Sequence, residues 1–369
     1  MPRTRPTTAP PARPADASSP IVPSRVSSEG IGRVRSRTTR RAPPRRERGS
    51  RPLPLSDGRR FDVVGTGIAT VDELLYVDAF PKPDGKMAAR AWMRSIGGLS
   101  AIAVATAARL GGTAAFLGAV GADDDLSRYV LDALAREGVD TTFTARVPGY
   151  TPIHAMIVVG IDPPTRNIFG FRPLDSSPPG LPPIPDEGIA AGQVLFVDSA
   201  HGPRTIAAMR TASARGIPVV ADIETNTSPH FPELFALADH LIVPVALGRT
   251  LAGPEADPPA MLRALWSDRR RLAAITDGEA GCWFRVAGDS AVWHQPAFPV
   301  VAQDTTGCGD VFHGAYALAI ARGESVAAAI RFASAAGAVK ASRAGGQAGL
   351  PRADDLAALL AHPPISRRI

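Results

Sequence analysis

The heptapeptide DTTGCGD, residues 304–310, contains the residue types that phosphoryl transfer to an alcohol needs. Gly307 and Gly309 allow backbone conformations closed to other residues and let a ligand approach the chain closely. The next residues, VFHGAYALAIA, predict a helix that begins at about Asp310 or Val311, so its free N–H groups point back at the loop. A carboxylate beside such an anion hole makes sense if a hydroxyl must lose its proton there. We therefore expect Asp310 to be a general base and the loop amides to stabilise the moving phosphoryl group.

The motif taken alone leaves a simpler interpretation open. Short Gly-x-Gly-Asp sequences also occur as turns in which the aspartate is an ordinary helix N-cap. Three other features accompany it here: Asp72 shortly after a first strand-like run, paired glycines Gly97 and Gly98 before a helix-like run, and TDGEAG after the strand-like RLAAI. The combination favours phosphate chemistry.

The elements that must position these residues follow from the pattern after Phe61, where short β-rich runs alternate with helical ones. Such alternation predicts an α/β fold with a mostly parallel central sheet covered by helices on both faces. Ligands of these sheets bind beyond the carboxyl ends of the strands. Polar residues stand at several of those ends, namely Asp198, Asp222 with Glu224, and Thr276.

Two segments, about 80–98 and 150–173, contain strand-like runs that no helix connects. We expect a small antiparallel β lid beside the main sheet, which would exclude water from a reacting phosphate. A pair of edge strands without function is the alternative. Arg166 lies in the second segment, where it can meet substrate or phosphate from the lid, although an exposed strand arginine is an equally good interpretation.

Charge is distributed unevenly along the 369 residues. Residues 1–60 hold 15 arginines against four acidic residues, a net charge of +11, so the rest of the chain sums to −5 within the total of +6. The pI of 9.9 therefore describes the first segment and does not indicate a nucleic-acid-binding protein. This segment is rich in Pro, Ser and Thr, and we expect residues 1–58 to be a disordered extension and residues 59–369 to form the folded domain. A solvated tail or an upstream start codon wrongly chosen is favoured over an electrostatic tether.

Two cysteines, Cys282 and Cys308, are too few for a disulfide framework, and no metal-ligand spacing involves them. No apolar run approaches the roughly 20 residues that span a bilayer. We expect a soluble, cytoplasmic protein with no membrane partner.

In their combined order these residues resemble the PfkB family of carbohydrate kinases, also called ribokinase-like. The likeness extends from Phe61 to Pro351, and DTTGCGDVFHGAY is its most specific part. The resemblance implies a three-layer α-β-α sandwich with a small β lid, an ATP-dependent activity, and Asp310 as catalytic base. It also implies an anion hole of Gly307, Cys308 and Gly309. Sugar hydroxyls would be contacted under the lid by Asp72, Gly97 and Gly98.

The resemblance also implies where cofactors bind. ATP would lie along Thr276, Gly278 and the run that contains Gly346. Asp304 and Thr306 would fall near a monovalent cation such as K⁺, which some members bind. Magnesium would accompany the ATP phosphates.

Two departures from the family pattern concern the substrate and the magnesium ion. Many members have an asparagine after the paired glycines, where this chain has Ile102, so the preferred sugar is expected to differ from ribose. The N-x-x-E pair that helps to position magnesium is replaced by Pro244 and Leu247. Glu224 or Asp222 is a candidate replacement for it. The missing N-x-x-E pair and the sequence around the glycine loop favour the ketohexokinase and sulfofructose kinase branch of the family.

Other motifs in the sequence give weaker evidence of function. GTGIAT has Thr70 where the dinucleotide fingerprint needs its third glycine, and no P-loop motif occurs. His313 is expected to pack beside Asp310 rather than to act as the base. The sequence thus predicts a kinase for a primary hydroxyl of a small sugar or sugar-like alcohol. A nucleoside kinase of the same fold and a catalytically weak sugar- or nucleotide-binding regulator are the alternatives, and the lid is a candidate homodimer contact.

Overall fold

The structure is a computed structural model that describes residues 59–162, 165–171 and 180–369. All described residues belong to one compact unit within Pro52–Ile369. The extension predicted for residues 1–58, and residues 163–164 and 172–173 of the predicted second lid segment, lie outside the described residues. Among the described residues, no helix has the length and apolar character needed to cross a membrane.

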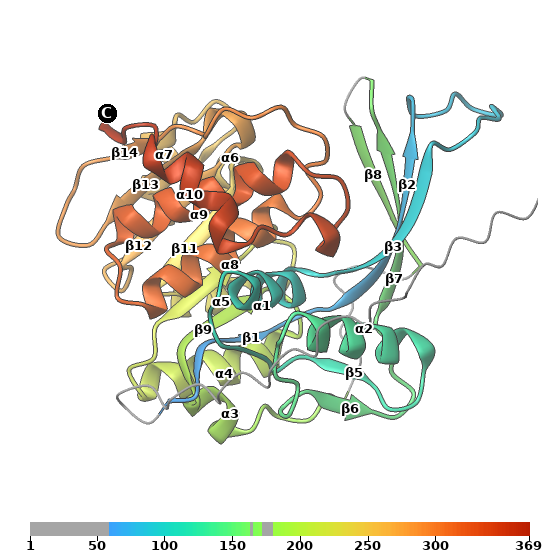
Figure 1. Ribbon diagram of the computed structural model, residues 1–369. Helices are drawn as coiled ribbons and strands as arrows, with labels where there is room; N and C mark the ends of the chain where they lie inside the picture. The colour runs from blue at the N-terminus through green and yellow to red at the C-terminus, as the bar shows by residue number, and fades with distance from the viewer. Residues whose placement is uncertain (1–58, 163–164, 172–179) are drawn as a thin grey trace, which may run out of the picture. The chain divides into compact units, whose positions relative to one another are not determined.

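The centre of the fold is a nine-stranded sheet (Figure 1). Six neighbouring strands, β4, β1, β9, β10, β11 and β12, pair in parallel. The remaining three, β13, β14 and β15, continue the sheet next to β12 by antiparallel pairing. The mostly parallel sheet predicted from the sequence is therefore confirmed. In spatial order the strands are β15 (Arg367–Arg368), β14 (Trp293–Gln295), β13 (Cys282–Val286), β12 (Leu272–Thr276), β11 (His240–Pro244), β10 (Val219–Asp222), β9 (Gly192–Asp198), β1 (Phe61–Thr66) and β4 (Ala114–Phe116).

Helices cover both faces of this sheet, because its parallel strands are apolar on both sides. Val63 and Val64 are neighbours in β1 and are both fully buried, one in each of two separate hydrophobic cores. Packed on the first core are α1 (Leu99–Arg109), α2 (Asp125–Arg136), α8 (Cys308–Ala321), α9 (Val326–Ala341) and α10 (Ala353–Ala361). Packed on the second are α3 (Asp186–Ala190), α4 (Gly202–Ala214), α5 (Phe231–Leu237), α6 (Val245–Ala252) and α7 (Pro258–Leu265).

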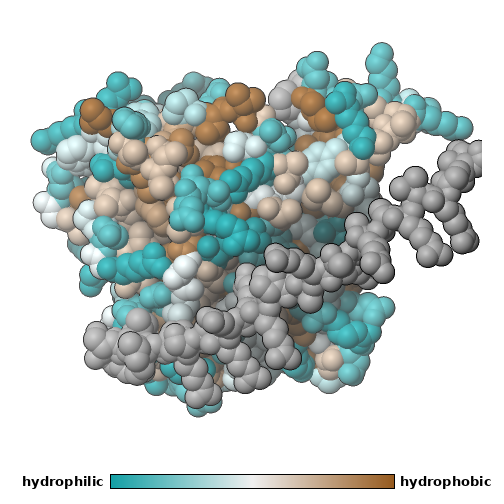
Figure 2. Space-filling view, in the orientation of Figure 1, coloured by the Kyte–Doolittle hydropathy of each residue, from teal (hydrophilic) through white to brown (hydrophobic). Residues whose placement is uncertain are grey.

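The lid is a separate four-stranded sheet in the order β3-β2-β7-β8. Its strands are β2 (Thr70–Val77), β3 (Ala91–Gly97), β7 (Ile153–Gly160) and β8 (Thr165–Gly170). The prediction of an antiparallel lid is wrong in one respect: β2 and β7 pair in parallel along their whole length. The sequence pattern failed here because Thr70–Val77 was not recognised as a second strand, so the partner of β7 was missing. Hydrophobic side chains reach the surface in this part of the molecule (Figure 2).

Two further details differ from the sequence expectations. The run TAAFLGAVG forms two short strands, because the chain leaves the main sheet after β4 and β5 (Ala119–Gly121) pairs with β6 (Ala145–Val147). Helix α8 begins at Cys308, earlier than predicted, which places Asp310 inside its first turn. Two single 3₁₀ turns, η1 (Gly278–Ala280) and η2 (Gln347–Gly349), complete the described elements.

Candidate active site

A cavity of about 610 Å³ opens at the carboxyl ends of the parallel strands, under the lid. Residues from both sheets line it, including Asp72 and Arg166 from the lid, and Gly98, Glu224 and Asp310 from the main body. The structure thus gathers residues that are up to 238 positions apart along the chain. The cavity lies where the sequence analysis expected a ligand to bind.

The N-terminus of α8 forms one wall of this cavity. Gly307 is the N-cap, with φ of 77°, a left-handed conformation that favours glycine. Thr306, Gly307 and Gly309 line the cavity. Among the described residues, the backbone N–H groups of Gly307, Gly309 and Asp310 have no protein acceptor, whereas that of Cys308 donates to Thr305 O at 3.3 Å. Unpaired amides at the start of a helix are suited to hold an anion.

Asp310 faces these amides from the first turn of α8. Burial and, to a smaller extent, the nearby charge of Glu224 raise the pKa of its carboxyl to about 7, while the charge of Arg166 opposes the shift. A carboxyl with this pKa is ionised above neutrality and still binds a proton readily, which suits a general base. Burial raises the pKa of the Cys308 thiol to about 11, so this cysteine is a neutral neighbour and not a nucleophile.

Two further carboxyl groups lie at the carboxyl ends of neighbouring strands of the main sheet. Asp198 ends β9 and Asp222 ends β10, and the two residues are direct partners in the parallel ladder. Burial raises the pKa of Asp198 to about 7, although the N–H groups of Ile68 and Ala200 donate to its oxygens. Burial also raises the pKa of Asp222 well above its ordinary value, and the charge of Glu224 adds to this.

Glu224 is accessible to solvent at the cavity, in contrast to Asp222. The cavity walls still reduce its hydration, which raises its pKa, and the charge of Arg166 lowers it. The side chain is exposed, and the neighbouring charge of Arg166 favours its ionised form. It is the carboxylate of this group with room for a ligand.

His313 lies beneath the loop, as the sequence analysis expected. Its Nδ1 is 2.8 Å from Gly309 O and 3.2 Å from Asp222 Oδ2, and its Nε2 is 3.2 Å from Ile242 O. Burial lowers the pKa of its ring to about 4. His313 therefore supports the first turn of α8 from behind.

The lid side of the cavity contributes one carboxyl and one guanidinium. Burial raises the pKa of Asp72 to about 6, against the hydrogen bond that Thr70 donates to its Oδ1 at 2.7 Å. Arg166 is exposed on β8 and donates to Thr305 O at 3.3 Å, so it reaches across to the loop before α8. These two residues place a hydrogen-bond acceptor and a cation on the lid side of the cavity.

The paired glycines have different structural roles. Gly98 lines the cavity as the N-cap of α1 with φ of 90°, and a Cβ there would stand 2.6 Å from Ile68 O. Gly97 is buried, and a Cβ there would stand 1.9 Å from Asp72 Oδ2. Gly97 therefore makes room for Asp72 and is not itself among the residues that line the cavity.

The residues assigned to ATP lie outside this cavity. Thr276 ends β12, two strands from Asp222, and Gly278 begins η1 with φ of 47°. Gly346 packs against β3, where a Cβ would stand 2.6 Å from Ser95 Oγ. Thr276 and Gly278 share the carboxyl edge of the sheet with the cavity, but Gly346 lies at the base of the lid. Their contacts with ATP stay a prediction.

The cluster around Asp304 contains a residue that the sequence analysis missed. Asp304 Oδ1 accepts from Thr306 N at 2.8 Å, and Oδ2 accepts from Tyr76 Oη at 2.7 Å and from Gly345 N at 3.0 Å. Lys340 is completely buried beside them. Burial alone would raise the pKa of Asp304, but the Lys340 charge and the hydrogen bond from Thr306 N outweigh it and hold this pKa below its ordinary value. A lone cation in the small-residue run FASAAGAVKAS was the available signal.

Magnesium ligands are sparse here. Pro244 and Leu247, at the place of the family's N-x-x-E pair, cannot bind a metal, and Leu247 is buried. Within the part of the chain that the structure describes, no three His, Cys, Asp or Glu side chains are grouped to hold a metal ion. Glu224 is the accessible carboxylate that would hold magnesium together with nucleotide phosphates, since this ion uses few protein ligands.

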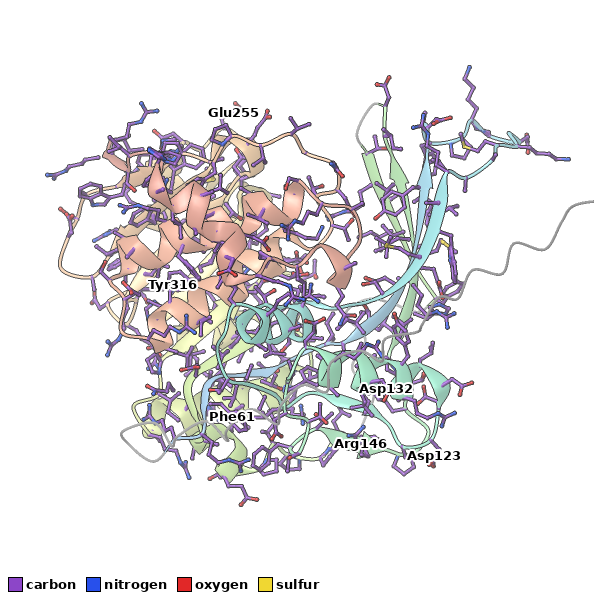
Figure 3. All side chains as sticks on the ribbon, viewed as in Figure 1. Phe61, Asp123, Asp132, Arg146, Glu255 and Tyr316 are labelled. Atoms are coloured by element: carbon purple, nitrogen blue, oxygen red, sulfur yellow. The ribbon has the colours of Figure 1, made fainter. Side chains whose placement is uncertain are left out.

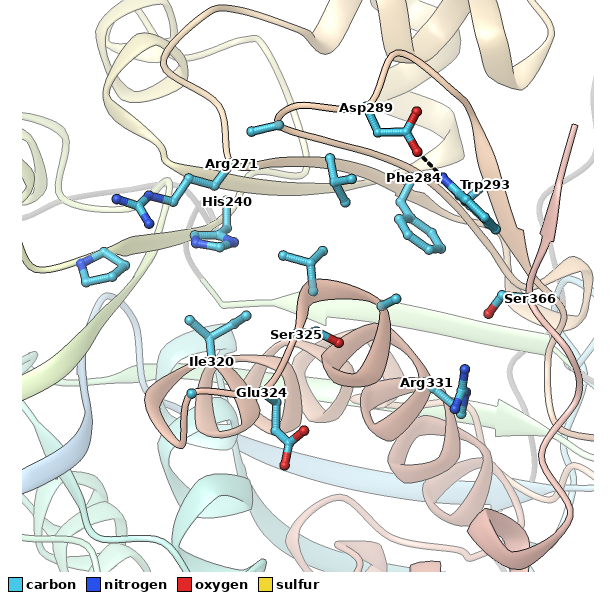
Figure 4. Close-up of a pocket in the computed structure, with 16 residues that line it drawn as sticks. His240, Arg271, Phe284, Asp289, Trp293, Ile320, Glu324, Ser325, Arg331 and Ser366 are labelled. Atoms are coloured by element: carbon cyan, nitrogen blue, oxygen red, sulfur yellow. Dashed lines mark hydrogen bonds between the residues drawn. The ribbon is translucent and has the colours of Figure 1, made fainter.

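A second cavity, of about 780 Å³, lies at the opposite end of the parallel strands (Figure 4). His240, Arg271 and Trp293 are among its lining residues. The His240 Nδ1 is 2.8 Å from the hydroxyl of Tyr316, a buried residue in the middle of α8 (Figure 3). None of the predicted site residues lines this wider cavity. The smaller cavity is the candidate active site, because carboxylates, free amides and a guanidinium converge there.

Comparison with known proteins identifies the family that this chain resembles. A sequence profile described as "pfkB family carbohydrate kinase" matches residues 60–353. A fructokinase of Klebsiella pneumoniae is 31% identical over 256 residues, which cover 64% of this chain and 78% of that protein. A ribokinase of Bacillus subtilis (strain 168) is 26% identical, over 82% of this chain and 100% of that protein.

Solved structures with the same fold include a putative ribokinase from Agrobacterium tumefaciens. It is 29% identical, with a TM-score of 0.73 over 80% of this chain and 96% of that one. An Arabidopsis thaliana ribokinase, whose structure contains ribose and ATP, is 22% identical, with a TM-score of 0.70 over 81% of this chain and 98% of that one. The second likeness bears on the fold alone.

Proposed function

Since the chain belongs to the pfkB family of carbohydrate kinases, we propose that it transfers the γ-phosphate of ATP to a primary hydroxyl of a small sugar or sugar-like alcohol. Asp310 accepts the proton of the attacking hydroxyl. The unpaired amides of Gly307 and Gly309 stabilise charge on the phosphoryl group in flight, and the lid excludes water. The Cys308 amide, predicted as the third member of the anion hole, would first have to release Thr305 O.

The observation that carries this proposal is the position of Asp310 beside unpaired amides at the start of α8, in one cavity with the lid residues. A base and an anion site in contact are the two groups that transfer to an alcohol needs. Asp72 and Gly98 face the same cavity and are placed to contact sugar hydroxyls, with Gly97 behind them. Arg166 is placed to meet either the sugar or the phosphate.

The acceptor is proposed to be a sugar rather than a nucleoside. Among the described residues that line the cavity, the aromatic rings are His201 and His230, and no Phe, Tyr or Trp is present to stack on a base. Ile102 replaces the asparagine of the family pattern, which favours an acceptor other than ribose. The ketohexokinase and sulfofructose kinase branch stays a prediction, because the named relatives are fructokinases and ribokinases.

ATP is proposed to extend from the α8 amides toward Thr276 and Gly278 along the carboxyl edge of the sheet, with Gly346 as a more distant candidate. Magnesium would be held by the phosphates and Glu224, and when bound it would neutralise phosphate charge. We place the whole activity in residues 59–369 and, because ATP is the donor and the two cysteines are unpaired, in the cytoplasm.

Replacing Asp310 with Asn tests the role of the base. We expect turnover to fall by about three powers of ten or more, because the amide cannot accept the proton, while ADP binding is retained. Turnover is measured as ADP release, and binding by calorimetry. Asp132→Asn, at an exposed position of α2, is the matched control and should leave both unchanged. Turnover near the wild-type rate in Asp310→Asn would remove Asp310 from the mechanism.

A panel of acceptors separates the candidate functions. The full chain is incubated with ATP, magnesium and, one at a time, aldoses, ketoses, sugar alcohols and nucleosides. ADP release with a sugar supports the proposal, and release with nucleosides alone supports the nucleoside kinase. The weak regulator is motivated by the lost N-x-x-E pair, and it would bind nucleotide without any acceptor-dependent ADP release.

A further inference from the structure

Lys340 is an unusual buried cation. The chain contains three lysines, and the other two, Lys82 and Lys86, are exposed next to the lid. Lys340 stands on α9 among alanines and is 0% exposed. A charged group is rarely buried in this way unless its charge and its hydrogen-bond donors have partners.

The partners of Lys340 are backbone oxygens from two loops. Its Nζ donates to Asp304 O at 3.2 Å and to Arg343 O at 3.4 Å. The first oxygen belongs to the loop that leads into the α8 N-terminus, and the second to the turn that follows α9. The Asp304 carboxylate supplies the negative charge nearby. A free cation would need oxygen ligands of this kind. Here the oxygens surround the ammonium group of a side chain that is covalently part of the protein.

A dissociable monovalent cation does not fit beside this ammonium. Such an ion needs several oxygen ligands, and both carboxylate oxygens of Asp304 already accept hydrogen bonds. The two carbonyl oxygens accept from Lys340. Among the described side-chain oxygens of the cluster, Thr306 Oγ1 is buried without a hydrogen-bond partner and is the one still available to an ion. One hydroxyl is too few ligands for a cation that a fixed ammonium also repels.

We propose that the Lys340 ammonium permanently takes the place of the monovalent cation, so that this enzyme needs no potassium. Lys340 is a positioning residue: it touches the loop that begins at Asp304, and that loop holds the amides of the anion hole. The inference rests on the proposed function only for its consequence in catalysis. The geometry of the ammonium and its oxygens does not depend on which alcohol is phosphorylated.

Thermal unfolding of the full chain tests the proposal without any substrate. The Tm is measured with and without ADP in potassium chloride and in tetramethylammonium chloride at equal ionic strength, because the large organic cation cannot enter the cluster. We expect the Tm of the wild type, and its increase with ADP, to be the same in the two salts. A higher Tm in potassium chloride for the wild type would overturn the proposal, and this arm needs no variant.

Substitutions then test whether the ammonium is what fills the site. Lys340→Ala removes the charge and leaves space, so we expect a lower Tm that rises again with potassium or methylammonium chloride but not with tetramethylammonium chloride. Lys340→Met removes the charge and fills the space, so neither cation should raise its Tm. Lys86→Ala, an exposed lysine, should behave as the wild type in every salt.

Two outcomes of the variant series contradict the proposal. A folded Lys340→Ala protein that ignores all small cations would show that the site does not hold a cation. Equal rescue of Lys340→Met would show that the rescue does not occur at this site. Absence of kinase turnover would refute the proposed function but would leave these unfolding results unchanged, so the two failures are distinguishable.

Discussion

Asp310 is a carboxyl group whose surroundings oppose its charge. Burial and the neighbouring Glu224 both favour its protonated form, and Arg166 offsets them only in part. A base of ordinary acidity would be ionised throughout the physiological range and would bind a proton weakly. Raising its pKa to about 7 improves proton transfer but makes activity sensitive to pH.

The pH dependence of turnover should show this directly. Because Asp310 must be ionised to accept a proton, we expect kcat/KM to fall about tenfold per pH unit below a pKa near 7. Glu224→Gln removes one nearby negative charge and should lower the pKa of Asp310, moving the acidic limb down by about half a pH unit or more. The measurement is a kcat/KM profile at saturating magnesium.

The control for this profile is Glu255→Gln, at an exposed position of the main body (Figure 3). Its acidic limb should coincide with that of the wild type. The position of the limb is the readout, because loss of a magnesium contact at Glu224 would lower the rate at every pH without moving the limb. An acidic limb that stays in place, or moves upward, in Glu224→Gln would contradict the electrostatic account.

The roles of single residues could be predicted where a local sequence motif contains them. The glycines around Cys308 and the adjacent Asp310 stand together in the chain, so their cooperation could be inferred from spacing. Lys340 was not predictable, because its partners are the backbone oxygens of Asp304 and Arg343, and a carbonyl oxygen leaves no trace in the residue type.

At the scale of elements, the start of α1 depends on a backbone conformation that side chains oppose. Gly98 caps this helix at φ of 90° and lies against the backbone that leads into β2, with room for no more than a hydrogen. The close contact joins the main sheet to the lid at the edge of the cavity.

Gly98→Ala should therefore be strongly destabilising. A new Cβ would stand 2.6 Å from Ile68 O and 2.8 Å from Ala69 Cα, in addition to the strain of a positive φ. We expect the free energy of unfolding to fall by more than about 2 kcal/mol, measured by urea denaturation.

Gly138→Ala separates the two causes. Its φ of 82° is similar, but nothing lies within 4 Å of the new Cβ, so only the strain of about 1 kcal/mol should appear. Equal losses in the two variants would show that the contact with Ile68 has no effect.

The elements themselves were predictable to different degrees. Hydrophobic runs bounded by turn residues identified the parallel strands of the main sheet, because these strands are buried on both faces, whereas β13, β14 and β15 were not predicted. Strand β2 was not predicted, because the polar residues Thr70, Asp72 and Glu73 interrupt its apolar pattern. All three are buried in the structure, two of them paired with each other and Glu73 with Arg94 and His154. Partners distant in the chain are invisible to a periodicity argument.

At the scale of the whole molecule, the lid leaves apolar side chains in water. Trp92 on β3 is 59% exposed, and Phe169 on β8 is 50% exposed. Across the lid sheet, Trp92 is in register with Leu75, and Phe169 with Met156. Along each strand of the lid, residues that face the cavity alternate with residues on the outer face. Trp92 and Phe169 both lie on the outer face, which supports the candidate homodimer contact.

Light scattering after size-exclusion chromatography tests this contact. We expect the wild type to be a dimer at micromolar concentration, and Trp92→Lys combined with Phe169→Lys to be a monomer, because two buried charges oppose association. The Tm of the main body should change little, since both side chains are exposed. Ile365→Lys, an equally apolar and exposed position outside the lid, is the control and should stay dimeric. A monomeric wild type would refute the contact.

The sequence also indicated the extent of the folded part. The profile match covers residues 60–353, next to the end of the arginine-rich segment, and the domain boundary at residues 58 and 59 stays a prediction. What the first 58 residues do stays a prediction, because composition describes their charge but not their contacts.

The hydroxyl of Tyr76 has a consequence beyond the loop it contacts. Tyr76 belongs to β2 of the lid, while its acceptor Asp304 precedes the amides proposed to bind phosphate, so this hydrogen bond is one of those that join the lid to the main body. Thermodynamic linkage then requires reciprocity: a sugar that orders the lid tightens nucleotide binding, and nucleotide tightens sugar binding by the same factor. Tyr76→Phe should weaken that synergy while each ligand alone still binds, which a pair of titrations with and without the second ligand would measure.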